Sequence, residues 1–237
     1  MSQPIKLYTW GTPNGFKVSI FLEFLGLKYD AIPVDIGKNE PKSDWFVKLN
    51  PNGRIPTIED PNFKSDNGGS SGSGPLVLSQ TGAILQYLAD TYDKQHKFSY
   101  PYGTAEYYKT LEYLIFQVSE NGPIQGQANH FILYAKEKVP YAINRYTTDV
   151  KRIYGVYEDI LSRNKANEGK YLVGDRYTVA DFALFGWAVA LKGLDIDIRQ
   201  WPLLSKWHDS LLKLPQVRKG LQAVPAKWIE EFLENIA

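Results

Sequence analysis

Hydrophobic and polar positions follow two different periods over roughly the first ninety residues. Short apolar segments rich in β-formers predict strands over 5–10, 29–36, 56–59 and 76–78. Apolar residues at three- and four-residue spacing predict two helices between these strands, over about 18–25 and 43–49, and one after the last strand, over about 80–92. Gly26 is expected to end the first helix. The order strand–helix–strand–helix–strand–strand–helix predicts one mixed sheet of four strands with helices packed on it.

The remaining chain has a helical period throughout. Apolar spacing predicts helices over 107–116, 142–161, 179–191 and 203–214. Gly122-Pro123 is expected to bend or break the first of these helices. The pattern therefore predicts an α/β domain over 1–95 and an all-helical domain over 104–237.

One short motif and one biased segment have structural interpretations. Thr178 and Asp181 have the spacing of a helix capping box, so we expect Asp181 to stabilise a helix start and not to take part in catalysis. The Gly/Ser run 65–74 is typical of a flexible linker. No Lys-Ser/Thr follows this run and no helix opens from it, which favours a hairpin-loop insertion over a phosphate-binding loop.

Composition excludes several classes of function. The 237 residues include no cysteine, so disulfide scaffolds, thiolate metal sites and a redox pair of the protein's own sulfurs are ruled out. Lys+Arg minus Asp+Glu is 27 − 26 = +1, which argues against binding to nucleic acid. The three histidines are scattered, so no metal site is expected. The longest apolar stretch, around 182–191, is too short to span a membrane, and no signal peptide precedes the first strand; we expect a cytoplasmic protein.

Three polar junctions could carry chemistry. Segment 8–17 joins the first strand to the first helix, where Thr and Asn side chains and free backbone N–H groups favour an anion. In segment 50–57 a proline stands at the start of a strand, and a cis bond there would turn the preceding backbone outward. Segment 80–84 opens a helix with short polar side chains. We expect the three junctions to converge on one edge of the sheet.

The chain resembles the cytosolic glutathione transferases, which combine a thioredoxin-like first domain with a helical second domain. Within that superfamily it is most similar to the fungal branch related to the yeast nitrogen-catabolite regulator and to the bacterial Nu-class disulfide-bond oxidoreductases. The resemblance covers nearly the whole chain. Its most specific stretches are Thr12–Lys17, Asn50–Pro56, Gly126–Phe131, Pro140–Tyr146 and Tyr171–Asp175.

The resemblance implies roles for particular residues. The backbone of Ile55, before a cis Pro56, would pair with the cysteinyl unit of glutathione. Gln80 and Thr81 would hold the γ-glutamyl carboxylate and amine. Asn14 and Thr12 would contact the sulfur, with Tyr8 and Thr9 as alternatives. Arg145 would lie near a dimer interface, across which some relatives share glutathione contacts, and is a further candidate for binding glutathione.

Two positions depart from the family pattern. Relatives usually have Glu-Ser where this chain has Gln80-Thr81, and a neutral amide cannot form an ion pair with the γ-glutamyl ammonium. Pro41 stands where the family often has Gln or His for the glycyl end, so Lys38 or Lys42 would have to replace that contact.

The resemblance implies a homodimeric enzyme that uses glutathione as cosubstrate against a small electrophile, a peroxide or a mixed disulfide. Conjugation in detoxification, peroxide reduction and disulfide reduction all need the same activated sulfur. The second substrate is expected in an apolar cleft between the domains; candidate lining residues are Tyr108, Phe116, Phe131 and Trp187, each of which could equally belong to the core. There are two alternatives. One is a regulator that binds a transcription factor, here without an Asn-rich leader before the domain. The other is a structural module of a larger assembly.

Overall fold

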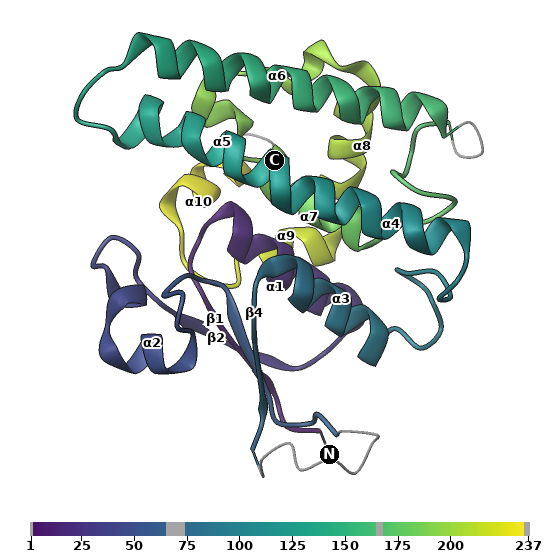
Figure 1. The fold of residues 1–237 in the computed structure, drawn as a ribbon. Coiled ribbons are helices and arrows are strands. Elements are labelled where there is room, and N and C mark those ends of the chain that lie inside the picture. Colours follow the sequence, from purple (N-terminus) through teal and green to yellow (C-terminus); the bar gives the residue numbers. More distant parts are fainter. Residues whose placement is uncertain (1, 65–73, 165–167, 235–237) are drawn as a thin grey trace. The chain divides into compact units, whose positions relative to one another are not determined.

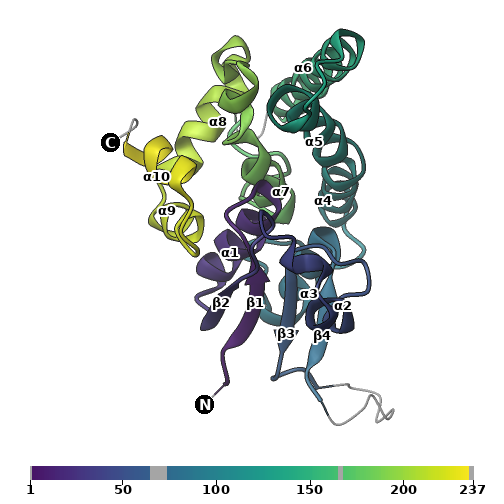
Figure 2. The same ribbon diagram turned by 90° about the vertical axis from the view of Figure 1, so that its left-hand side faces the viewer.

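The computed structural model describes residues 2–64, 74–164 and 168–234, which form two compact units (Figures 1 and 2). The first unit contains residues 1–88 and 215–237, and the second contains residues 89–214. These units are defined by packing, and the domain limits of 1–95 and 104–237 stay a prediction. Residues 65–73 of the Gly/Ser run, predicted as a loop insertion, lie outside the described residues.

The first unit contains the predicted four-stranded mixed sheet. Its strands are β1 (Ile5–Thr9), β2 (Tyr29–Pro33), β3 (Thr57–Asp60) and β4 (Leu76–Ser79). The order among the described strands is β2-β1-β3-β4; β1 is parallel to β2, and the other two pairs are antiparallel. β2 is three residues shorter than predicted, because the chain turns at Asp35, whose Oδ1 accepts a hydrogen bond from the Gly37 amide at 2.8 Å.

The helices of this unit begin with α1 (Pro13–Leu25), which ends as predicted at Gly26 in the left-handed conformation, at φ 65°. The others are the 3₁₀ turn Glu40–Lys42, α2 (Asp44–Leu49), α3 (Thr81–Tyr92), α9 (Pro215–Leu221) and α10 (Lys227–Glu234). Helix α9 packs along α1 (Figure 2). Gly220 allows this close approach, because a Cβ there would lie 2.5 Å from Ile20 Cα, and its carbonyl accepts a hydrogen bond from Ser19 Oγ at 2.7 Å.

The second unit is helical. Its main helices are α4 (Ala105–Phe116), α5 (Gly122–Asn129), α6 (Pro140–Arg163), α7 (Val179–Ala188) and α8 (Pro202–Leu212). Short 3₁₀ turns cover Leu191–Leu194 and Ile198–Gln200. The core side chains with almost no exposure include Tyr154, Tyr157, Phe182, Phe185 and Trp207. The fold class predicted from the pattern and from the resemblance is confirmed.

Gly122-Pro123 was expected to bend or break the helix, and it does not break it. The backbone passes from α4 to α5 through a π-helical turn, Gln117–Asn121, and a second π turn, His130–Tyr134, extends α5. Pro123 is the second residue of α5. The π turn before it shifts the pattern of backbone hydrogen bonds, so the N–H that proline lacks is tolerated there. Gly122-Pro123 therefore changes the type of helix and does not end it.

The predicted capping box is confirmed. Asp181 Oδ2 accepts hydrogen bonds from the Thr178 amide and hydroxyl at 2.8 and 3.0 Å, and its Oδ1 accepts from Leu172 N and Trp207 Nε1. Burial raises the pKa of Asp181 to about 6, against the opposing effect of these donors. Asp181 therefore stabilises the start of α7, as expected.

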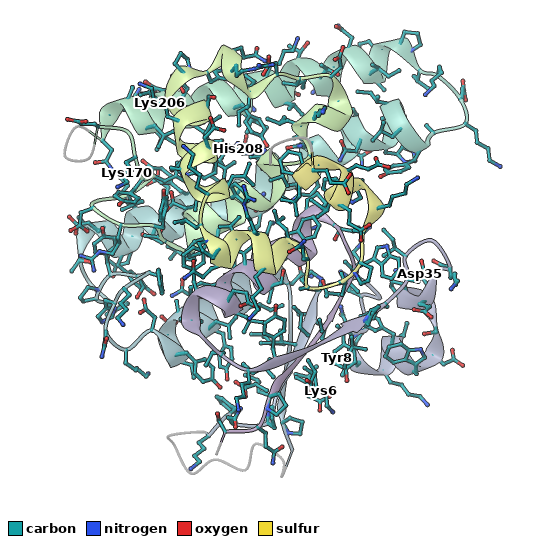
Figure 3. All side chains as sticks on the ribbon, turned by 180° about the vertical axis from the view of Figure 1, so that it is seen from behind. Lys6, Tyr8, Asp35, Lys170, Lys206 and His208 are labelled. Atoms are coloured by element: carbon teal, nitrogen blue, oxygen red, sulfur yellow. The ribbon has the colours of Figure 1, made fainter. Side chains whose placement is uncertain are left out.

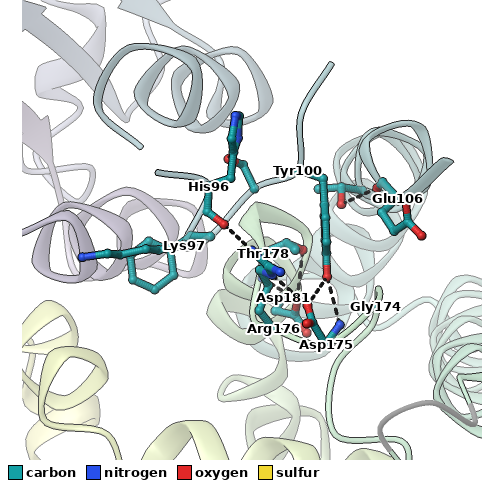
Figure 4. A network of polar contacts seen from close by, with 12 residues as sticks. His96, Lys97, Tyr100, Glu106, Gly174, Asp175, Arg176, Thr178 and Asp181 are labelled. Atoms are coloured by element: carbon teal, nitrogen blue, oxygen red, sulfur yellow. Dashed lines mark hydrogen bonds and ion pairs between the residues drawn. The ribbon is translucent and has the colours of Figure 1, made fainter. Parts of the chain in front are cut away.

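A second polar network connects segment 93–100 to segment 174–178 (Figure 4). Tyr100 donates its hydroxyl to Asp175 Oδ1 at 2.9 Å, and Arg176 Nε donates to the same oxygen at 2.8 Å. The Arg176 guanidinium also lies over the Tyr100 ring, 4.7 Å from its centroid, and donates to the His96 carbonyl. The network holds two loops of this unit together.

Candidate active site

The register of the sheet brings the three polar junctions to one end. Tyr8, near the end of β1, pairs with Thr57, the first residue of β3, and Thr57 pairs with Ser79, the last residue of β4. Thr57 Oγ1 and Ser79 Oγ are 2.9 Å apart. The first helix leaves the sheet at this end, the Ile55-Pro56 loop enters it there, and Gln80-Thr81 follow it. The expected convergence is therefore a direct result of strand pairing.

The start of α1 is built to present polar groups. Thr12 caps the helix, its Oγ1 accepting from the Gly15 amide at 3.3 Å, and Pro13 and Asn14 occupy the first two positions. Gly15 is required here, because a Cβ would lie 2.4 Å from both Thr9 Oγ1 and the Trp10 carbonyl. Since a hydroxyl can accept one bond and donate another, the Thr12 O–H stays available to a ligand.

The loop before β3 presents its backbone. The Ile55-Pro56 peptide bond is cis, as the sequence predicted. Asn50 supports the loop, because its Nδ2 donates to the Arg54 carbonyl at 2.6 Å and to Thr57 Oγ1 at 3.3 Å. Among the described residues, the amide and carbonyl of Ile55 have no hydrogen-bond partner. A peptide ligand could therefore pair with both groups as an added strand.

The start of α3 has an unusual backbone. Gln80 lies at φ 73°, a region that non-glycine side chains rarely adopt, and its carbonyl accepts the first helical bond, from Ile84 N at 2.9 Å. Such outliers gather at ligand sites, where the surrounding structure holds them. Gln80 is exposed, and Thr81 next to it is 9% exposed. The first turn of α3 thus offers backbone N–H groups and one hydroxyl to an anion.

A buried lysine connects the starts of α1 and α3. Lys17 is 1% exposed, and its Nζ donates to Thr81 Oγ1 at 3.3 Å. Burial lowers the pKa of Lys17 to about 7. Sequence reasoning missed this residue, although a signal was present: α1 is apolar on nearly every side, and a helix of that kind is buried all round.

The alternative sulfur contacts are engaged elsewhere. Tyr8 and Lys6 are labelled in Figure 3. Tyr8 donates its hydroxyl to Glu59 Oε2 at 3.3 Å, and the same carboxylate accepts from Lys6 Nζ at 2.7 Å. Burial, and then the charge of Glu59, raises the pKa of Tyr8. Thr9 is buried, and its hydroxyl donates to the neighbouring Trp10 carbonyl at 3.4 Å. The assignments of Asn14, Thr12, Tyr8 and Thr9 as sulfur contacts all stay predictions.

The candidates for the glycyl contact are lysines near the loop at 50–57. Lys42 Nζ donates to the Asn52 carbonyl at 3.0 Å, which holds it beside this loop. Lys38 forms an exposed ion pair with Asp35 at 3.4 Å. Pro41, between them, is buried. Lys42 is therefore the better placed of the two lysines, and its role stays a prediction.

The remaining candidates belong to the second unit. Arg145 is exposed on α6, and its role in the site or at an interface stays a prediction. Trp187 is 7% exposed and belongs to the core. Phe116 packs on Tyr157 at a centroid distance of 5.1 Å and Phe131 stacks on Tyr146 at 5.8 Å, whereas Tyr108 is half exposed.

The described residues contain neither a cluster of metal ligands nor a helix able to cross a membrane. No three His, Asp or Glu side chains gather in a group that could hold a metal ion within residues 2–64, 74–164 and 168–234. Over the same ranges, no helix combines the length and the apolar character needed to cross a membrane.

Comparisons with known proteins match both parts of the chain. Residues 3–90 match the family model of the glutathione S-transferase N-terminal domain, and residues 129–223 match that of the C-terminal domain. The crystal structure of a glutathione transferase homolog from Lodderomyces elongisporus, which holds two GSH per subunit, is 76% identical, with a TM-score of 0.90 over 94% of this chain and 100% of that one.

Two curated relatives are similar over nearly the full chain. The disulfide-bond oxidoreductase YfcG of Escherichia coli is 36% identical over 217 residues, covering 92% of this chain and 94% of the relative. Protein URE2 of Eremothecium gossypii is 32% identical over 255 residues, covering 93% and 69%. The chain belongs to the glutathione S-transferase family, and the resemblance inferred from its motifs is confirmed.

Proposed function

We propose that the protein binds glutathione at the sheet end formed by the three junctions and stabilises its thiolate for attack on a second substrate. The Ile55 backbone would pair with the cysteinyl unit, Gln80 and Thr81 would hold the γ-glutamyl end, and Asn14 and Thr12 would contact the sulfur. Lys42 would reach the glycyl end.

The observation that carries the proposal is the open backbone of Ile55 beside two helix starts. An extended peptide can pair with that amide and carbonyl, and each end of the peptide then approaches polar donors. Glutathione matches this arrangement because it is a short peptide with a carboxylate at each end and a thiol between them.

The required activation is within reach of these groups. A thiol with a pKa near 8.5 is about 3% thiolate at pH 7, and lowering its pKa by two units needs about 2.7 kcal/mol. One hydrogen bond to a charged group contributes about 1.5–3 kcal/mol, and an exposed helix N-terminus up to about 1 kcal/mol. Asn14 or Thr12 together with α1 therefore suffices, and no general base is needed.

The chemistry uses sulfur from the ligand, because the sequence contains no cysteine. In conjugation, the thiolate forms an S–C bond and the electrophile releases its leaving group. In disulfide reduction, the thiolate forms a mixed disulfide with one substrate sulfur and releases the other as a thiolate. The thiolate of a second glutathione then attacks the glutathione sulfur of the mixed disulfide, which gives glutathione disulfide and releases the remaining substrate sulfur as a thiolate. A peroxide is reduced to an alcohol and water by two glutathiones, which become the disulfide. The two GSH per subunit in the Lodderomyces elongisporus structure fit a reaction with two thiols.

The test combines binding with three assays on the same preparation. Isothermal titration measures the affinity for glutathione, and parallel assays follow conjugation of 1-chloro-2,4-dinitrobenzene and reduction of cumene hydroperoxide and 2-hydroxyethyl disulfide. We expect binding and at least one activity, both reduced by Asn14→Ala. A protein that binds no glutathione and accelerates none of the reactions would contradict the proposal.

The assembly and location stay predictions: a homodimer in the cytoplasm, with a role in detoxification. Regulation of a protein partner is the alternative activity. Capture of a partner that is unaffected by Asn14→Ala, in a protein without turnover, would favour that alternative.

A further inference from the structure

The buried ammonium of Lys17 needs an explanation beyond packing. An ammonium loses several kcal/mol of hydration when it is buried, and hydrogen-bond partners have to offset that loss. A methionine would fill the same volume without that cost, so packing in an apolar helix does not require a charge at this position. The hydrogen bond from Lys17 Nζ to Thr81 Oγ1, at 3.3 Å, points instead to the start of α3.

The Thr81 hydroxyl can relay the charge. A hydroxyl has one donor and two acceptor lone pairs, and Lys17 occupies one lone pair. The Thr81 O–H then remains as a donor, and a hydroxyl that already accepts from a cation donates more strongly. Thr81 is the first residue of α3, so this donor lies beside the free N–H groups of the first turn.

We propose that Lys17 is a positioning residue that orients and polarises the Thr81 hydroxyl toward the α-carboxylate of the γ-glutamyl group. The inference rests on the function proposed above and deepens it. On this proposal the protein recognises the γ-glutamyl end of glutathione chiefly through the α-carboxylate, because Gln80 carries no charge that could pair with the ligand's ammonium.

Two truncated ligands separate the carboxylate from the amine. Glutaryl-Cys-Gly keeps the terminal carboxylate of glutathione and lacks the amine, whereas 4-aminobutanoyl-Cys-Gly keeps the amine and lacks the carboxylate. Titration calorimetry at pH 6, below the Lys17 pKa of about 7, gives the affinity of the wild type, Lys17→Met and a control variant for glutathione and both analogues. The control is Ser19→Ala, which removes another buried polar group of α1, one that bonds to the Gly220 carbonyl and not to Thr81.

We expect Lys17→Met to weaken binding of glutathione and glutaryl-Cys-Gly by about tenfold, the lower end for a hydrogen bond to a charged group. Binding of 4-aminobutanoyl-Cys-Gly should change by less than about twofold, because the group that Thr81 holds is missing. Ser19→Ala should leave the ratios among the three ligands unchanged. Thr81→Val, which removes the hydroxyl and keeps the shape, should reproduce the selectivity and serves as the second variant if Lys17→Met does not fold.

An equal loss for all three ligands in Lys17→Met or Thr81→Val would overturn the inference and leave a purely structural role. Wild-type affinity for glutathione is read in the same titrations, so failure of the proposed function is seen separately as no binding by the unmodified protein.

Discussion

The choice of Asn14 as the sulfur contact leads to a quantitative prediction. If Asn14 and the α1 N-terminus together lower the thiol pKa from 8.5 to about 6.5, about three quarters of bound glutathione is thiolate at pH 7. Asn14→Ala removes one hydrogen bond to a charged atom, about 1.5–3 kcal/mol, and so raises the bound thiol pKa by about 1–2 units. The thiolate fraction at pH 7 then falls about 3- to 25-fold.

Tyr8→Phe is the matched control. The Tyr8 hydroxyl donates to Glu59 at 3.3 Å, so we expect this variant to lose a bond on the sheet and none to the sulfur. We expect its bound thiol pKa to stay within about 0.3 units of the wild type, since one unit corresponds to 1.36 kcal/mol.

The assay is the thiolate absorbance near 240 nm of saturated complexes, titrated from pH 5 to 9, with the conjugation rate measured in parallel. The difference in conjugation rate between the wild type and Asn14→Ala should become smaller at high pH, because the glutathione bound to either protein is then mostly thiolate. The reasoning is refuted if Tyr8→Phe raises the thiol pKa as much as Asn14→Ala does, or if Asn14→Ala leaves it unchanged.

Three further predictions concern stability, measured by chemical denaturation. Burial lowers the pKa of Lys17 from 10.5 to about 7, so between these pH values the unfolded state binds more protons and the free energy of unfolding rises with pH. From pH 7 to pH 9, the free energy of unfolding of the wild type should rise by about 2 kcal/mol relative to that of Lys17→Met. A difference that does not change with pH would contradict this prediction. Gly15→Ala places a Cβ 2.4 Å from Thr9 Oγ1 and should cost about 1–3 kcal/mol; an unchanged midpoint would show that α1 can shift. Asp181→Ala leaves four donors without their acceptor and should cost about 3 kcal/mol or more, while Asp175→Ala, on the surface, should cost about 1 kcal/mol or less.

Local chemistry explains why several predictions from sequence are confirmed. Gly26 ends α1 because a left-handed residue is required there, and the Thr178–Asp181 spacing closes a capping box whatever surrounds it. The cis bond at Ile55-Pro56 belongs to the same class, because only proline makes it accessible. Such features depend on neighbours a few residues away.

Other features depend on partners far along the chain. The π turn at Gln117–Asn121, in place of a break, reflects a helix held by its packing against α6 and α7, which overrides the local effect of Gly122-Pro123. Helix α9 joins the first unit because Gly220 lets it contact α1, two hundred residues away in sequence. No local pattern contains these contacts.

The sequence by itself determined the fold class, the family, the three polar junctions and the absence of cysteine. The tertiary structure decided that the junctions meet, because Tyr8, Thr57 and Ser79 pair in the sheet. It also decided that the buried Lys17 connects the starts of α1 and α3. The reason is physical: strand register and the burial of a charge are set by contacts between segments distant in sequence, whereas caps, turns and periodicity are set within a few residues.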